Sequence, residues 1–100
     1  KKKAPTKKWI ATSEKFSKGK IHINDGAKIA LLKNDAASLL PVGVVKIEGE
    51  FAPKDIVSIV DETGNSIGLG RVDYDTVGAL EVIGKNGQKP IIHYNYLYLK

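Results

Sequence analysis

Residues 38–51 read SLLPVGVVKIEGEF, and this stretch decides what kind of fold the sequence encodes. A stiff apolar corner, Leu39-Leu40-Pro41, leads directly into a segment typical of a β-strand. Proline has no N–H for a sheet ladder, so Pro41 is expected at the first residue of a strand or on an edge. Gly43 and Gly49 interrupt the strand pattern, and glycine relieves the bend where a strand turns a corner in a small barrel. The stretch therefore predicts one strand of a small, bent β-structure.

Alternation along this strand predicts which side chains share a face of the sheet. Successive side chains of a β-strand point to opposite faces. We therefore expect one face to carry Val45, Ile47 and Gly49, and the other to carry Val44, Lys46, Glu48 and Glu50.

Further short strands follow from runs of apolar and β-branched residues. Such runs predict strands at residues 21–23, 55–60 and 66–74, and a long last strand within residues 89–100. Glycine-containing turns are expected at residues 63–65 and 86–87.

Two short helices are expected between these strands. One covers residues 26–35 and ends near Asn34, with Asn24 or Asp25 as its N-cap, because alanines and a leucine recur there at helical spacing. The other runs from residues 74–76 to about Gly84. The whole order predicts a mainly β (α+β) fold, a mostly antiparallel small barrel of about five to six strands with two short helices.

The net charge of +5 is unevenly divided along the chain. Residues 1–20 hold eight lysines and one glutamate, a net charge of +7, whereas residues 21–100 hold eight basic and ten acidic residues, a net charge of −2. Affinity for nucleic acid comes from clustered cations that displace counterions from phosphates. The slightly acidic body therefore counts against a dedicated nucleic-acid binder.

Composition narrows the class of protein further. One hundred residues suit a single domain with its own core. The absence of cysteine excludes disulfides and thiolate metal sites, and no apolar run approaches the ~18 residues of a membrane span. The chain begins with lysine and contains no methionine, so we expect it to be a piece of a longer protein.

No residue pattern indicates catalysis or metal binding. The two histidines, His22 and His93, lack the spacing of metal ligands, and structural roles are expected for both. Gly68-Leu69-Gly70 lies inside a predicted strand without a third spaced glycine, so it does not predict a dinucleotide-binding loop. We predict no catalytic residue and no metal site.

The last strand carries three tyrosines at period two. Tyr94, Tyr96 and Tyr98 are expected on one face, opposite His93, Asn95, Leu97 and Leu99. Such a face could stack bases of single-stranded nucleic acid, or it could dock against a neighbouring element such as Trp9 or another domain. The scarcity of cations in the body favours docking.

Together these segments resemble a known family. The order IHINDGAKIALL, SLLPVGVVKIEGEFAPKDIVSIVDETG and GLGRVDYDT is similar to PUA domains, compact pseudo-barrels best known for binding structured RNA. The leader around Lys7-Lys8-Trp9, the helix start Asp25-Gly26-Ala27 and the final IIHYNYLYL resemble the carboxyl-terminal PUA domain of bacterial glutamate 5-kinases. On this resemblance, residues 1–8 are a basic interdomain linker and residues 9–100 are the PUA domain.

That resemblance implies chemistry located in another domain. Glutamate 5-kinases transfer phosphate from ATP to glutamate in the first step of proline synthesis, and their ATP and Mg²⁺ sites lie in an amino-terminal kinase domain. The resemblance implies no cofactor in this fragment, and a kinase domain in cis or a second subunit of the parent as the partner. The absence of cysteine suits a reducing cytoplasm. The last strand departs from the family pattern at Tyr94-Asn95-Tyr96, and the segment GKNGQKP is shorter than in many relatives.

The resemblance also suggests a binding groove beside the first helix. In RNA-binding PUA domains this groove takes the RNA backbone, and the matching positions here are Lys28, Ser38, Leu40, Pro41, Gly43 and Val44. A glycine at residue 43 would let a partner's backbone come close. The same corner also serves simply to join the helix to the barrel, which is the interpretation we favour.

The sequence is therefore compatible with three functions. The first is a non-catalytic domain with a regulatory or structural role in a glutamate 5-kinase. The second is an RNA-binding module of an RNA-modifying enzyme, and the third is a domain joined to a different catalytic partner. The Lys-Lys-Trp-Ile leader matches the kinase junction and argues against the third.

Overall fold

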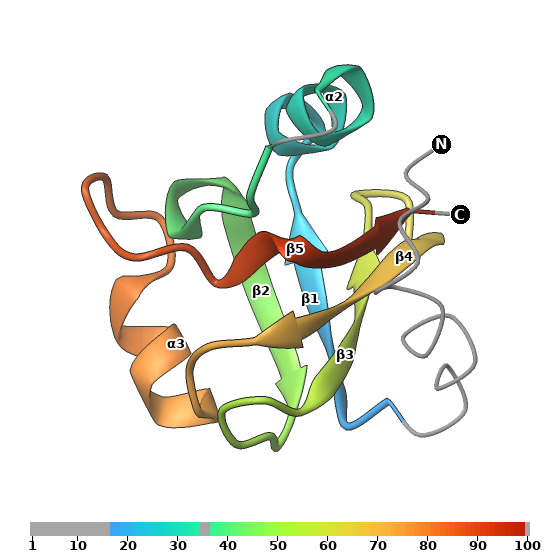
Figure 1. The fold of residues 1–100 in the computed structure, drawn as a ribbon. Coiled ribbons are helices and arrows are strands. Elements are labelled where there is room, and N and C mark those ends of the chain that lie inside the picture. The colour runs from blue at the N-terminus through green and yellow to red at the C-terminus, as the bar shows by residue number, and fades with distance from the viewer. Residues whose placement is uncertain (1–16, 35–36, 100) are drawn as a thin grey trace.

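The computed structural model describes residues 17–34 and 37–99, which form a five-stranded mixed sheet with two α-helices (Figure 1). The strands and helices are β1 (Gly19–Ile23), α2 (Asp25–Lys33), the short 3₁₀ helix η3 (Pro41–Gly43), β2 (Val44–Gly49), β3 (Ile56–Val60), β4 (Ser66–Val72), α3 (Thr76–Val82) and β5 (Ile92–Leu99). The expected mainly β fold with two short helices is confirmed. The linker predicted at residues 1–8 lies outside the described residues, so the domain limits stay a prediction.

The strands lie side by side in the order β2-β1-β3-β4-β5. Strand β1 runs parallel to β3, and every other neighbouring pair is antiparallel. Within the described residues the two edge strands, β2 and β5, are joined through the apolar corner. Leu39 donates its N–H to the carbonyl of Ile92 at 2.9 Å and accepts from the N–H of Ile91 at 2.8 Å. The corner thus bridges the gap between the edges of a sheet that curls towards a barrel.

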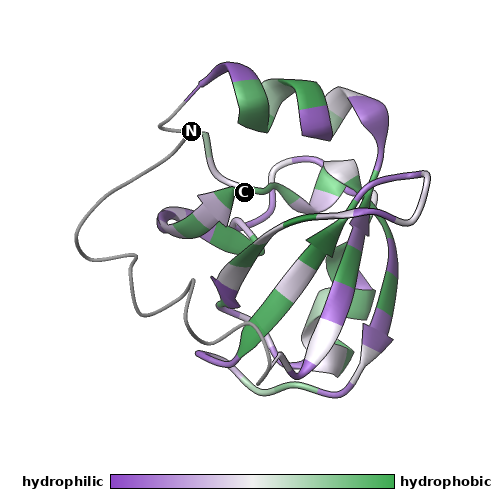
Figure 2. Cartoon of the chain, turned by 90° about the vertical axis from the view of Figure 1, so that its right-hand side faces the viewer, coloured by the Kyte–Doolittle hydropathy of each residue, from purple (hydrophilic) through white to green (hydrophobic). Residues whose placement is uncertain are grey.

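The core lies inside this curled sheet. Hydrophobic and hydrophilic bands alternate along the strands, as expected for a sheet with one face turned inward (Figure 2). Fourteen buried residues form one hydrophobic cluster, contributed by all five strands, both α-helices and the segments next to them: Ile21, Ile23, Leu31, Leu39, Val44, Phe51, Val57, Ile59, Val72, Ala79, Ile91, Ile92, Leu97 and Leu99. Burial of this apolar surface is the main term that stabilises the fold.

A β-bulge in β2 overturns the expected alternation of that strand. Ile23 of β1 pairs with Val44, whereas the preceding His22 pairs with Lys46, so Val45 is an extra residue without a partner. Val44 is 2% exposed and Val45 is 53% exposed. The bulge therefore turns Val44 to the inner face together with the half-buried Ile47, and our expectation that Val45 shares a face with Ile47 was wrong.

Local capping explains where the helices begin. Asn24 caps α2, because its Oδ1 accepts the N–H of Ala27 at 2.8 Å, and Asp75 caps α3 by accepting the N–H of Gly78 at 2.7 Å. Pro41 is the first residue of η3 and not of a strand, since the missing N–H costs nothing at the start of a helix. Strand β2 begins only at Val44.

Candidate functional site

A groove lies between α2 and the corner that leads into η3, with a volume of about 320 Å³. One wall is α2, and the other is the segment from Ser38 to Gly43. The described residues that line it are mostly apolar and carry no charge: Asn24, Gly26, Ala27, Ala30, Leu31, Ser38, Leu39, Leu40, Val42 and Gly43. We call this the α2 groove.

Both polar side chains of the α2 groove are already engaged in hydrogen bonds. Asn24 accepts the N–H of Ala27 as the helix cap. The Oγ of Ser38 accepts the N–H of Tyr94 at 2.9 Å, which ties the corner to β5. The rest of the described lining is apolar and without charge, so the groove suits an aliphatic side chain better than a phosphate.

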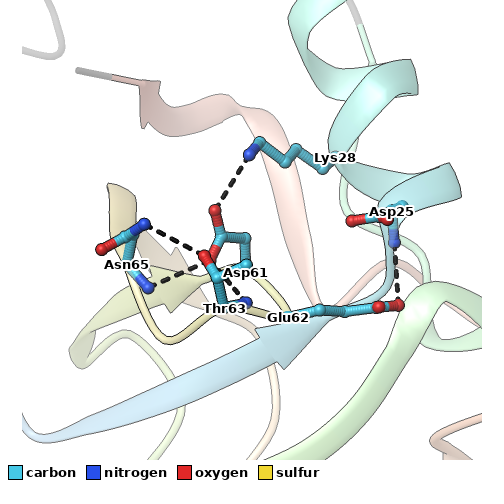
Figure 3. A network of polar contacts seen from close by, with 6 residues as sticks. All are labelled: Asp25, Lys28, Asp61, Glu62, Thr63 and Asn65. Atoms are coloured by element: carbon cyan, nitrogen blue, oxygen red, sulfur yellow. Dashed lines mark hydrogen bonds and ion pairs between the residues drawn. The ribbon is translucent and has the colours of Figure 1, made fainter.

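The structure brings together three of the six groove residues suggested by the sequence. Ser38, Leu40 and Gly43 line the groove, and Leu40 is 48% exposed at its rim. Pro41 and Val44 are buried and do not line the groove. Lys28 lies outside the lining and points to the β3–β4 turn (Figure 3).

Residue 43 has no room for a side chain, because α2 passes directly over Gly43. A Cβ atom added to Gly43 would lie 2.5 Å from the Cβ of Ala27. Atoms that close must move apart. The close approach that the glycine permits is thus made by a helix of the same chain, which agrees with the interpretation of the corner as a join between helix and barrel.

Replacing Gly43 by alanine should lower the free energy of unfolding by about 1–3 kcal/mol, because the new methyl group overpacks the contact with α2. Urea unfolding followed by circular dichroism measures this change. The double variant Gly43→Ala/Ala27→Gly restores the space. Its loss of unfolding free energy should therefore be smaller than the sum of the losses of the two single variants. Additive effects in this double-mutant cycle would show that the two residues do not press on each other.

An ion pair holds α2 to the turn between β3 and β4 (Figure 3). The Nζ of Lys28 lies 2.9 Å from the Oδ2 of Asp61, whose side chain is 4% exposed. One turn earlier in the helix, the N–H of Asp25 donates to the Oε2 of Glu62 at 3.1 Å. These two contacts hold α2 to the turn, in addition to the burial of Leu31 in the core.

Asp61 also organises the turn itself. Its Oδ1 accepts the N–H of Thr63 at 3.0 Å, the hydroxyl of Thr63 at 2.7 Å and the N–H of Asn65 at 3.0 Å. The hydrogen bond from Lys28, followed by that from the Thr63 hydroxyl, holds the pKa of Asp61 well below its usual range. The same contact raises the pKa of Lys28. One carboxylate therefore shapes the turn with one oxygen and holds α2 with the other.

The three tyrosines of β5 lie in different surroundings. Tyr94 is 37% exposed and stacks on the ring of His93, with centroids 4.4 Å apart. Tyr96 is half-buried under the guanidinium of Arg71, whose central carbon lies 3.6 Å from the ring centroid. Tyr98 is also half-buried, paired with Leu69 of β4. The rings of Tyr94 and Tyr96 thus already stack on other side chains of the same chain.

Sequence reasoning did not single out Asp61 or Arg71. The spacing Asp61-x-Thr63-x-Asn65 after a buried strand is a signal for a carboxylate that accepts hydrogen bonds from its own turn. Arg71 gave no local signal, because its partner Tyr96 lies 25 residues further along the chain.

A match to a family model places the chain in a family. A family model described as PUA domain matches residues 19–94, and the chain belongs to the PUA domain family. A solved PUA domain from Aeropyrum pernix K1, a tartrate complex, is similar over 76% of this chain and 41% of its own, with 28% identity and a TM-score of 0.68.

Curated relatives connect the domain to one enzyme. A glutamate 5-kinase of Bacteroides thetaiotaomicron is 53% identical over 94% of this chain and 26% of its own length. A glutamate 5-kinase of Chlorobaculum tepidum is 43% identical over 97% of this chain and 27% of its own length. The chain therefore spans about a quarter of the length of the curated relatives it matches, which carry this domain as part of a longer chain.

Two further findings concern the described residues alone. No group of three or more His, Asp or Glu side chains among them is placed to hold a metal ion. None of their helices has the length and apolar character that crossing a membrane requires.

Proposed function

We propose that this chain is the non-catalytic PUA domain of a glutamate 5-kinase and contributes to the regulation, stability or assembly of that cytoplasmic enzyme. The observation that carries the proposal is the 53% identity to a glutamate 5-kinase across 94% of the chain. The parent enzyme would phosphorylate glutamate with ATP and Mg²⁺ in a kinase domain outside this chain. The chain itself would need no cofactor.

Docking is the mechanism that the surface supports best. The rim of the α2 groove exposes two large apolar side chains, Leu40 at 48% and Val42 at 41%. We propose that this rim packs against the kinase domain of the same chain, because the relatives are about four times as long as this chain.

The charges near the groove support docking over RNA binding. The described lining holds no cation, and Lys28 already neutralises the buried Asp61. At the start of α2, Asp25 and Glu62 add two carboxylates. A phosphate backbone would meet more negative than positive charge at this site, which opposes binding.

The test uses the proposed parent enzyme with and without residues 17–100 of this sequence. We expect the shortened enzyme to keep a comparable kcat for ADP release in the presence of glutamate but to lose thermal stability or its oligomeric state, measured by sedimentation. Loss of all turnover in a shortened enzyme that is still folded and assembled would contradict a non-catalytic role.

Two surface variants of the parent locate the docking site. Leu40→Asp should reproduce the loss of stability or assembly, whereas Val77→Asp, on the exposed face of α3, should not. A titration of the 100-residue chain with structured RNA at moderate salt should show no more than nonspecific affinity, roughly micromolar or weaker. Tight, sequence-dependent RNA binding would favour the RNA-binding alternative instead.

A further inference from the structure

Strand β5 makes an unusually wide bulge opposite Arg71. Gly70 of β4 pairs with Leu97 and Val72 pairs with Ile92, so the single residue Arg71 faces the four residues 93–96. Bulges of this kind re-aim side chains and are frequent beside functional sites. The bulged residues include His93, Tyr94 and Tyr96, and Tyr96 lies under the guanidinium of Arg71.

The guanidinium of Arg71 lies over the ring of Tyr96 and has no acidic partner among the described residues. Its guanidinium carbon lies 3.6 Å from the centroid of Tyr96. No carboxylate forms an ion pair with it in the described part of the chain, and its Nε is buried without a hydrogen-bond partner. A half-buried guanidinium without an acceptor is costly, so such a group in a folded protein calls for an explanation.

The ring of His93 borders the same tyrosine, Tyr96. Its Nδ1 accepts the N–H of Asn95 at 3.1 Å, so the neutral ring carries its proton on Nε2. The rings of His93 and Tyr96 have centroids 6.4 Å apart. The ring of Tyr96 therefore has the guanidinium of Arg71 over it and the imidazole of His93 beside it.

The charge available suits one carboxylate and not a chain of phosphates. Arg71 is the one residue with a fixed positive charge in strands β3, β4 and β5. An arginine presents its donors in a planar fork that matches a carboxylate. A polyphosphate needs several cations in a row, and the described strands β3, β4 and β5 carry only this one.

We propose that Arg71, Tyr96 and His93 form a binding site for a carboxylate, which would be accepted by the terminal N–H groups of Arg71 above the Tyr96 ring. The carboxylate would come from a small organic acid or from an acidic side chain of a protein partner, and the recognising chemistry is the same. This site lies outside the α2 groove and does not depend on the proposed function.

The test exploits the fact that Arg71 is the one arginine in the chain. An ¹⁵N-labelled sample of the 100-residue chain gives a single arginine Nε–H signal, so no assignment is needed to follow it by NMR. Titration with succinate or with tetraglutamate should shift this signal along a saturable curve. A response to succinate supports a small acid, and a response to tetraglutamate alone supports an acidic side chain.

Variants and competing ligands decide between the outcomes. Arg71→Lys keeps the charge but loses the fork, and should weaken binding by about tenfold or more as followed on the Tyr96 amide signal. Arg71→Gln removes the charge as well as the fork and should abolish the titration. The matched control Lys85→Gln removes one positive charge from an exposed position and should leave the titration unchanged. The proposal is overturned if neither acid gives a saturable shift, or if inorganic phosphate or oligouridylate shifts the signal and the carboxylates do not.

Discussion

Replacing Gly68 by alanine is expected to remove about 3 kcal/mol or more from the free energy of unfolding, a large share of the 5–15 kcal/mol typical of a domain. A Cβ at this residue would lie 2.2 Å from the carbonyl oxygen of Tyr98 and 3.1 Å from the Cα of Leu99. Both are backbone atoms of β5, so no side-chain rotation can relieve the clash. Strands β4 and β5 would have to separate, and the buried Leu97 and Leu99 would lose packing. Urea unfolding at equilibrium measures the change.

A matched glycine serves as the control for Gly68→Ala. Gly26 lies in the first turn of α2, and the nearest atom to an added Cβ is the Oδ1 of Asn24 at an ordinary 3.5 Å. Alanine favours a helix over glycine by up to about 1 kcal/mol, so Gly26→Ala should be neutral or slightly stabilising. If Gly68→Ala cost no more than Gly26→Ala, the close approach of β5 to β4 would not be required for stability.

The Gly68-Leu69-Gly70 segment shows what sequence can and cannot predict. Its position inside a strand was evident from the surrounding apolar residues, and the structure places it in β4. The reason for its glycines is that β5 crosses close to β4 at this point, with the side chain of Ile92 2.7 Å from a Cβ added to Gly70. That neighbour lies 22 residues further along the chain, so no local pattern indicates it.

Local features of the fold were predictable because their causes are local. The N-cap Asn24 and the turn glycine Gly64, with its φ of 90°, follow from residues within a few positions. The bulge at Val45 was not predictable, because it depends on how β1 and β2 register with each other. The same limit applies to the corner, where Leu39 is buried and its backbone bonds to Ile91 and Ile92, which lie far later in the sequence.

The candidate site divides in the same way. The family resemblance located the groove wall at Ser38, Leu40 and Gly43, but it assigned Lys28 to the groove as well. Lys28 turns away because the carboxylate of Asp61, 33 residues later in the sequence, forms an ion pair with it. Sequence alone cannot tell whether a charged residue on a short helix binds a ligand or pairs within the chain. That depends on where the neighbouring turn lies in the fold.

Replacing Asp61 by alanine should therefore release both the β3–β4 turn and α2. The variant removes the acceptor for Lys28, for the N–H and hydroxyl of Thr63 and for the N–H of Asn65. Because these donors surround a buried carboxylate, we expect the thermal midpoint to fall by on the order of 10 °C. Lys28→Met breaks only the link to α2, so its midpoint should fall less. Hydrogen exchange should accelerate in α2 for both variants but in the turn for Asp61→Ala alone.

The pH dependence of this effect separates the ion pair from simple packing. The pKa of Asp61 is lowered by folding, so its contribution is present above the ordinary pKa of aspartate, about 4, and is lost as the pH falls through the lower folded value. The pKa of Lys28 is raised, so its contribution is present below about 10.5 and is lost as the pH rises further. The midpoint difference between the native chain and Lys28→Met should therefore be full between about pH 4 and 10 and shrink outside this window. The control Lys33→Met removes a cation from the exposed end of α2 and should show no such window. A difference for Lys28→Met that stays constant from pH 2 to pH 7 would mean that the lysine acts through its aliphatic stem, and that its charge does not hold α2 to the turn.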